Sequence, residues 1–235
     1  MANKSNPATQ TISIPQGGGA LHGIGETFAP DLHTGTSNFT VPIALPPGRN
    51  GFQPQLSLVY STGNSNGPYG LGWSLTIPGV SRKTSKGLPR YRNDSGPGHE
   101  GDTFLLSGAE DLIPVSETGG ITRYRPRTEG LFARIEHHAT PETDHWEVRS
   151  KDGLVSVYGT PFTWPDDPAA TANPENRAEV FSWNLTKTVD PFGNTMQYEY
   201  ERDTGDTSDH HWDQLYLKRI QYVDYTEPIT DGPPR

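Results

Sequence analysis

Apolar and polar residues alternate with a period of two along most of the chain. The segment NFTVPIAL places Phe39, Val41 and Ile43 on one side, and QLSLVYS does the same with Leu56, Leu58 and Tyr60. Because successive side chains of a β-strand point to opposite faces, this pattern predicts half-buried strands. Helical periodicity is nearly absent. Pro42 has no N–H to donate, so it predicts an edge strand or a strand that needs no donor at that position.

Clusters of Gly, Pro, Asn and Asp separate roughly a dozen such strands, as in sandwiches and other all-β folds. The chain has 26 Gly and 22 Pro in 235 residues. We predict an all-β fold of many short antiparallel strands with Gly/Pro-rich turns, either sandwich-like or part of a β-sheet shell. The longest break, residues 160–177, is expected to be a surface loop with one helical turn near Ala169 to Ala172.

Composition and charge exclude several classes of protein. The net charge of −9 disfavours binding to nucleic acid or to anionic membranes, and the lack of cysteine excludes disulfides. No apolar stretch is long enough for a membrane span, and the N-terminus lacks the apolar core of a signal peptide. The sequence predicts a soluble protein that, if secreted, is exported by a non-classical route.

The glycine clusters and histidine pairs are the candidate ligand sites of the sequence. STGNSNGPYGLG leads into a strand rather than a helix, and PQGGGALHGIGE has no following Gly-Lys-Ser/Thr, so both favour turns over phosphate cradles. His137 and His138 should point to opposite faces of a strand, and His210 and His211 lie in a polar segment, which favours solvated loops over metal sites. We predict no catalytic, cofactor-binding or metal-binding residues.

Four motifs occur in order: SIPQGGGALHGIGE, LPPGRNGFQPQLSLVYSTGNSNGPYGLGWSL, SRKTSKGLPRY and TRYRPRTEG. Together they resemble the N-terminal region of the Salmonella plasmid virulence protein B (SpvB) family, which includes the B subunits of insecticidal toxin complexes. The segment from Asp190 to Tyr200, with its Asp-x-x-Gly-Asn turn and Tyr-x-Tyr strand, resembles one degenerate Rhs (tyrosine–aspartate) repeat.

The resemblance implies a structural or delivery role in a secreted bacterial toxin or virulence protein. The domain would help form the housing or carrier for a downstream effector, and would be non-enzymatic, with any ADP-ribosylation residing in a downstream or partner domain. Its partners would be downstream parts of the same polypeptide and other toxin-complex subunits, with the host-cell surface as a further candidate. The family residues that carry over are packing residues: Gly17, Gly18, Gly19, Tyr60, Gly67, Pro68, Gly70, Gly72 and Trp73.

The expected organisation is a flexible N-terminus over residues 1–12, one β domain over 13–228 and a linker or truncation point over 229–235. A stripe of Arg123, Arg125 and Arg127 on one strand face is a candidate interaction surface, with a solvated face as the alternative. A second hypothesis is a binding module for a host-surface or carbohydrate ligand, which would use the aromatic residues Tyr69, Trp146, Trp164 and Trp212. A third is an enzyme whose active-site residues are scattered along the chain.

Overall fold

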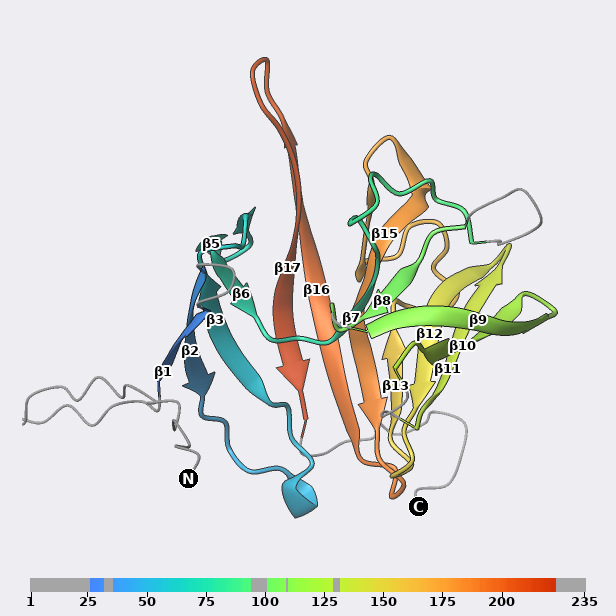
Figure 1. Ribbon diagram of the computed structural model, residues 1–235, viewed down its shortest axis with the longest axis horizontal. Coiled ribbons are helices and arrows are strands. Elements are labelled where there is room, and N and C mark those ends of the chain that lie inside the picture. Colours follow the sequence, from blue (N-terminus) through green and yellow to red (C-terminus); the bar gives the residue numbers. More distant parts are fainter. Residues whose placement is uncertain (1–25, 32–35, 94–100, 109, 129–131, 223–235) are drawn as a thin grey trace, which may run out of the picture. The chain divides into compact units, whose positions relative to one another are not determined.

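The structure is a computed structural model that describes residues 26–31, 36–93, 101–108, 110–128 and 132–222. These residues form seventeen strands and one short 3-10 helix, η1 (Arg49–Gly51), and every strand pairing is antiparallel (Figure 1). The all-β, antiparallel prediction is therefore confirmed.

The chain forms two compact units. Unit 1 comprises Met1–Ala44 and Gln55–Thr76, and unit 2 comprises Leu45–Pro54 and Ile77–Arg235. The predicted domain limits at residues 12/13 and 228/229 lie outside the described residues and stay predictions.

Unit 1 is a four-stranded sheet in the order β1-β2-β3-β6. Its strands are β1 (Thr27–Asp31), β2 (Thr36–Ile43), β3 (Leu56–Ser61) and β6 (Trp73–Leu75), and β4 (Asn66–Gly67) and β5 (Gly70–Leu71) form a separate small hairpin. In cross-strand register, Phe39 lies beside Tyr60 and Tyr60 beside Trp73. The alternating pattern thus collects the large apolar side chains of unit 1 on one face of the sheet.

Unit 2 contains a closed eight-stranded barrel. Its strands are β7 (Gly79–Arg82), β8 (Phe104–Leu106), β9 (Glu110–Thr118), β10 (Ile121–Pro126), β11 (Arg134–Thr140), β12 (Thr143–Arg149), β13 (Val155–Tyr158) and β15 (Asn176–Val189). The ring closes because β15 pairs with β13 on one side and with β7 on the other. Closure leaves these strands without a free edge over the paired stretches.

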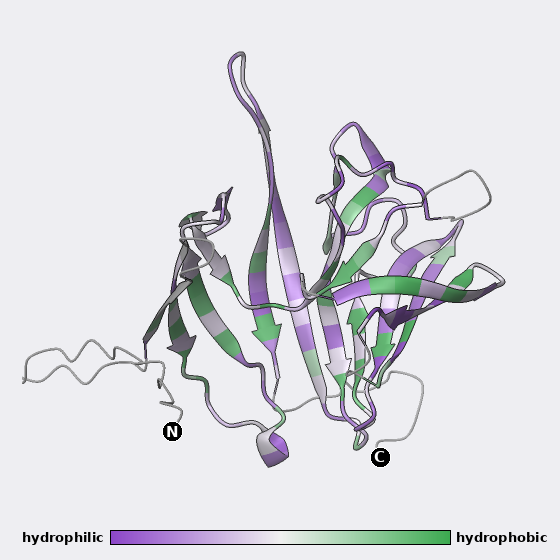
Figure 2. Ribbon diagram, in the orientation of Figure 1, coloured by the Kyte–Doolittle hydropathy of each residue, from purple (hydrophilic) through white to green (hydrophobic). Residues whose placement is uncertain are grey.

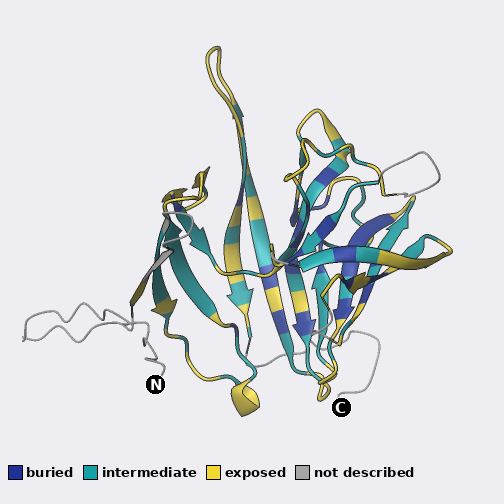
Figure 3. Ribbon diagram, in the orientation of Figure 1, coloured by how far each residue is buried: buried dark blue, intermediate teal, exposed yellow. Residues whose placement is uncertain are grey.

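Aromatic residues fill the barrel. Phe104, Trp146 and Trp183 are fully buried, and the three rings pack at centroid distances of 4.9–5.9 Å. Apolar and polar positions alternate along the strands in Figure 2, and the buried residues concentrate in the barrel strands in Figure 3. This core is the packing that the period-two pattern of the sequence predicts.

A long hairpin of β16 (Thr195–Asp206) and β17 (His211–Gln221) continues from β15 and extends past the barrel strands (Figure 1). β16 pairs with β15 only from Thr195 to Gln197, whereas it pairs with β17 from Gln197 to Asp206. The turn into β16 is held by Asp190, whose Oδ1 accepts hydrogen bonds from the N–H groups of Phe192 (2.9 Å) and Asn194 (2.8 Å). This is the turn that the Asp-x-x-Gly-Asn pattern predicts.

The segment 160–177 differs from its prediction. It contains strand β14 (Ala170–Asn173), which pairs with β15, where a helical turn was expected. Ala169 and Ala170 are buried, whereas Phe162, Pro165 and Asp166 are exposed, so only part of the segment lies on the surface. The short run Ala-Ala-Thr-Ala carries no periodicity that distinguishes a helical turn from a strand.

Candidate functional site

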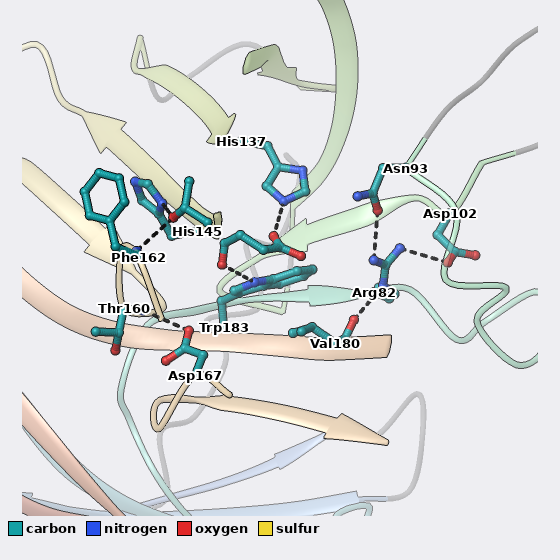
Figure 4. Close-up of polar contacts among 12 residues, drawn as sticks. Arg82, Asn93, Asp102, His137, His145, Thr160, Phe162, Asp167, Val180 and Trp183 are labelled. Atoms are coloured by element: carbon teal, nitrogen blue, oxygen red, sulfur yellow. Dashed lines mark hydrogen bonds and ion pairs between the residues drawn. The ribbon is translucent and has the colours of Figure 1, made fainter. Parts of the chain in front are cut away.

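The most unusual group in the barrel is the buried guanidinium of Arg82, at the end of β7. Arg82 is only 3% exposed. Its Nε donates to the carbonyl of Val180 (2.7 Å), its Nη1 to Asp102 Oδ2 (3.0 Å) and its Nη2 to Asn93 Oδ1 (2.8 Å) (Figure 4). A buried charge is tolerated only when it is paired and hydrogen-bonded, and these three acceptors meet that requirement.

Aromatic rings complete the surroundings of this guanidinium. Its Cζ lies 5.0 Å from the ring centroid of Phe104, 5.4 Å from Tyr91 and 5.5 Å from Trp183, all within cation–π distance. Burial lowers the pKa of Arg82 from its usual value, and the charge of Asp102 opposes that change. The arginine stays charged because its ordinary pKa is so high.

Asp102 extends the same network into the segment that precedes β8. Besides Arg82 it accepts hydrogen bonds from the backbone N–H groups of Arg90 (2.9 Å) and Arg92 (3.3 Å), while its own N–H donates to the Arg92 carbonyl (2.9 Å). One carboxylate thus fastens the backbone of residues 90–92 to the barrel core.

A second buried polar pair lies between β11 and β12. His137 Nε2 and Asp144 Oδ1 are 2.6 Å apart, and the His137 ring stacks on Trp146 at 4.2 Å with an interplanar angle of 5°. Trp183 Nε1 donates to the Asp144 carbonyl (3.1 Å; Figure 4). Among the described residues, His137 has no hydrogen bond to a serine or threonine hydroxyl. The pair thus lies buried against the aromatic rings of the core.

The opposite face of the same two strands carries another histidine pair. His138 and His145 stack at 4.7 Å, and His145 Nδ1 lies 2.7 Å from the Thr143 hydroxyl, which also accepts from the Phe162 N–H (3.1 Å). Burial lowers the pKa of His145 to about 4, with a further contribution from the neighbouring histidines. His145 is accordingly neutral at pH 7.

Asp167 organises the segment between β13 and β14. Its Oδ2 accepts from the Thr160 N–H (2.8 Å) and its Oδ1 from the Ala169 N–H (2.8 Å). Burial raises the pKa of Asp167, and these backbone donors oppose the shift. Gly159 has a φ of +79°, and a Cβ there would lie 2.8 Å from Asp167 Oδ2 and 2.9 Å from Trp183 Cδ1. Only glycine fits this position without displacing its neighbours.

The structure brings together some of the packing residues inferred from the sequence. Gly72 has a φ of +81°, and a Cβ there would lie 2.5 Å from Tyr60 Cε2. The Tyr60 and Trp73 rings are 5.3 Å apart across β3 and β6. The glycine thus lets the chain enter β6 directly against the Tyr60 ring.

The other residues of that set lie apart from this contact or outside the described residues. Gly67 and Gly70 face each other in the β4–β5 hairpin, with Pro68 exposed between them. Gly17, Gly18 and Gly19 lie outside the described residues. A packing role for the whole set stays a prediction.

The three arginines of the predicted stripe differ in their surroundings. Arg123 and Arg125 lie exposed on β10, on the side opposite the buried Tyr124. Arg127 follows the end of β10, and its Nη1 lies 3.5 Å from Asp111 Oδ2.

The structure also shows where the histidine and aromatic residues considered as binding candidates lie. The expectation of a solvated loop is wrong for His137, which is 1% exposed, whereas His211 pairs with Asp206 (2.8 Å) at the exposed hairpin tip. Trp146 is fully buried, so it offers no stacking surface. Three other aromatic side chains keep some exposure: Tyr69 (40%), Trp212 (37%) and the half-buried Trp164. Among the described residues, no group of three or more His, Asp or Glu could hold a metal ion.

The buried Arg82–Asp102 and His137–Asp144 pairs are the residues that sequence reasoning missed. The available signal was Arg82 itself, two positions after Val80 in a strand and therefore on the same, inward face. Partners such as Asp102 and Asn93 lie 20 and 11 residues away, and no local pattern links them.

Fold and core together define a β-barrel domain built around a buried polar and aromatic network, and comparisons with known proteins assign its family. Residues 31–231 match the family described as "Salmonella virulence plasmid 65kDa B protein". The chain belongs to this family. Mono(ADP-ribosyl)transferase SpvB of Salmonella choleraesuis (strain SC-B67) is 31% identical over 93% of this chain and 39% of its own length, and SpvB of Salmonella typhimurium is 31% identical over 93% and 38%. The chain thus spans about two fifths of these relatives.

Solved structures agree with the assignment. The crystal structure of TcdB2-TccC3 matches 97% of this chain and 12% of that chain, with a TM-score of 0.71 and 30% identity. The N-terminal domain of the effector protein SpvB from Salmonella typhimurium strain LT2 matches 79% of this chain and 64% of that chain, with a TM-score of 0.64 and 28% identity. The resemblance to SpvB and to toxin-complex proteins is confirmed, and the chain is a toxin-associated domain.

One prediction from the sequence is contradicted. We expected no enzymatic activity, with any ADP-ribosylation confined to a downstream or partner domain, but the curated relatives carry the name mono(ADP-ribosyl)transferase. The sequence contains none of the short catalytic signatures, and their absence does not decide the activity of the protein.

No helix among the residues that the structure describes has the length and apolar character to cross a membrane.

Proposed function

We propose that the chain is a structural and delivery domain of a secreted toxin or virulence protein, and that it helps form the housing or carrier of an effector. The observation that carries this proposal is the match of 97% of the chain to a segment of TcdB2-TccC3 at a TM-score of 0.71 and 30% identity.

The architecture suits such a role. A closed barrel leaves no edge over its paired stretches for unwanted strand pairing. The buried Arg82–Asp102 network fastens the residues that precede β8 to this barrel. A wall built from such units keeps its shape while another segment of polypeptide is carried or released.

Partners and location follow from the same relationship. We infer that the domain acts with other parts of a longer polypeptide and with other toxin subunits, and that it leaves the producing cell. The host-cell surface remains a candidate contact, for which Tyr69 and Trp212 keep exposed ring surface.

A segment exchange tests the proposal. This chain replaces the matching segment of TcdB2-TccC3, and assembly is followed by size-exclusion chromatography beside the parent protein. We expect the chimaera to elute and resist protease like the parent. A soluble chimaera that no longer forms the parental assembly would contradict a shared structural role.

The name of the curated relatives gives a second candidate, participation in mono(ADP-ribosyl) transfer by the full-length protein. Incubation of the 235-residue chain and of the full-length polypeptide with labelled NAD⁺ and a cell extract tests it. Label on an extract protein with the 235-residue chain alone would place the activity in this chain. Label only with the longer polypeptide would assign the activity to the whole protein.

A further inference from the structure

The outer face of β10, β11 and β12 carries an unusual concentration of arginine. On β10, Tyr124 and Pro126 are buried, while Arg123 and Arg125 point to the exposed side. Arg134 on β11 and Arg149 on β12 are both exposed and face each other in register. We call these residues, together with Glu136 and Glu147, the arginine face.

Exposed arginines lie on the outer face of three neighbouring strands. The register of β10 and β11 pairs Arg123 with Glu136 and ends with Tyr124 opposite Ile135. Arg134 in turn lies opposite Arg149. Like charges directly opposite each other destabilise a sheet, so the Arg134–Arg149 pairing itself does not stabilise the fold.

The carboxylates on this face are already engaged. Glu136 Oε1 lies 2.6 Å from Arg134 Nη2, and Glu147 Oε1 lies 2.5 Å from Arg149 Nη2. Although Glu136 stands opposite Arg123, its ion pair is with Arg134. Within the described part of the chain, Arg123 and Arg125 have no ion pair, unlike Arg134 and Arg149.

The charges around the arginines indicate which class of anionic partner they can bind. The chain as a whole has a net charge of −9, which disfavours close approach of a polyphosphate or an anionic membrane. Glu136 and Glu147 lie among the arginines and would repel a continuous line of phosphates. Spaced carboxylates of another protein can meet the guanidinium groups of Arg123 and Arg125 and avoid both glutamates, and the planar guanidinium matches a carboxylate in a bidentate pair.

We propose that the arginine face binds an acidic segment of another polypeptide, whose carboxylates pair with Arg123 and Arg125. This interaction surface goes beyond the proposed housing role and does not depend on it, because it requires only that β10 to β12 be exposed. Binding weakens as salt rises, since the paired side chains lie at the surface.

Fluorescence anisotropy with a labelled peptide of glutamates spaced by glycine and serine as the probe tests the proposal on the 235-residue chain. The variant R123Q/R125Q is expected to bind about tenfold more weakly than the unchanged chain, the loss that corresponds to two exposed charge contacts. The matched control K218Q/R219Q removes the same charge from exposed positions on β17, which pair with Glu201 and Glu199. It should stay within about twofold of the unchanged chain.

Four results would overturn the proposal. These are absence of binding to the spaced-glutamate peptide at low salt, equal weakening in both variants, and tighter binding to phosphatidylserine vesicles or heparin that R123Q/R125Q abolishes. The fourth is self-association in analytical ultracentrifugation that R123Q/R125Q abolishes, which would make a second copy the occupant. Circular dichroism of both variants verifies that the exposed substitutions leave the fold intact.

Discussion

At the scale of single residues, the barrel depends on a few polar groups held inside an aromatic core. Arg82 is the central one, because it joins β7, β15 and the residues before β8 through Asp102, Asn93 and the Val180 carbonyl. Sequence alternation placed Arg82 on an inward face, but its partners come from distant segments that no local pattern connects. Burial of an arginine is therefore visible in the sequence only as an exception to the apolar pattern.

Removing the Arg82 charge should destabilise unit 2 strongly. In Arg82→Met, Asp102 keeps a buried charge without its cation, which costs about 3 kcal/mol or more in the free energy of unfolding. The exposed Arg219, paired with Glu199, is the control, and Arg219→Met should cost less than about 1 kcal/mol. Urea denaturation followed by tryptophan fluorescence measures both variants. Similar losses in the free energy of unfolding would contradict a larger contribution from the buried pair.

Alanine substitutions at Gly159 and Gly193 separate the cost of backbone strain from the cost of steric clash. Both have positive φ, +79° and +85°, but a Cβ at Gly159 meets Asp167 and Trp183, whereas nothing lies within 4 Å at Gly193. Gly193→Ala should cost about 1 kcal/mol from the left-handed backbone alone, and Gly159→Ala about 2–4 kcal/mol because overpacking is added. Thermal denaturation of the two variants checks the order, and a reversed order would contradict the tight packing around Gly159.

His145 should make stability depend on pH. Its pKa falls from 6.5 to about 4 on folding, so between these values the unfolded chain binds a proton that the folded chain does not. Its contribution is complete above pH 6.5 and is lost as the pH falls toward 4. His145→Gln should reduce the change of the urea midpoint with pH over that window, relative to the unchanged chain. An unchanged pH dependence would show that other groups dominate.

At the scale of elements, the sequence predicted strands well and their partners poorly. Pro42 illustrates the point: β2 lies between β1 and β3, and among the described residues its pairing with β1 ends at Thr40, which leaves Pro42 without a β1 partner. The prediction of a strand without a donor at that position fits, while the edge-strand alternative does not. Closure of the barrel through β13 and β15 joins residues about 30 positions apart, which period-two patterns do not reveal.

The β16–β17 hairpin should open more readily than the barrel. Beyond Gln197, β16 pairs with β17 alone, and most residues toward the tip are exposed. Backbone amides of 203–206 and 211–214 should therefore exchange with solvent much faster than those of β8 and β12, whose neighbours lie on both sides. Hydrogen exchange with mass spectrometry measures this, and equal protection would mean that the hairpin and barrel open as one unit.

At the scale of the whole molecule, the family could be predicted from the sequence because several glycine- and proline-rich motifs occur in a fixed order. Those motifs encode turns whose positive φ few other residues adopt, as at Gly72 beside Tyr60, so they remain readable in a distant relative. Enzymatic activity could not be predicted in the same way, since the absence of a short signature says nothing about the full-length protein.

The central claim, that the domain helps to house an effector, is tested most directly by limited proteolysis. The full-length polypeptide that contains this chain is digested with and without residues 26–222, and survival of its effector segment is followed by mass spectrometry. We expect the effector segment to resist protease in the intact polypeptide and to be degraded rapidly after the deletion. Equal resistance in both proteins would contradict a housing role for this domain.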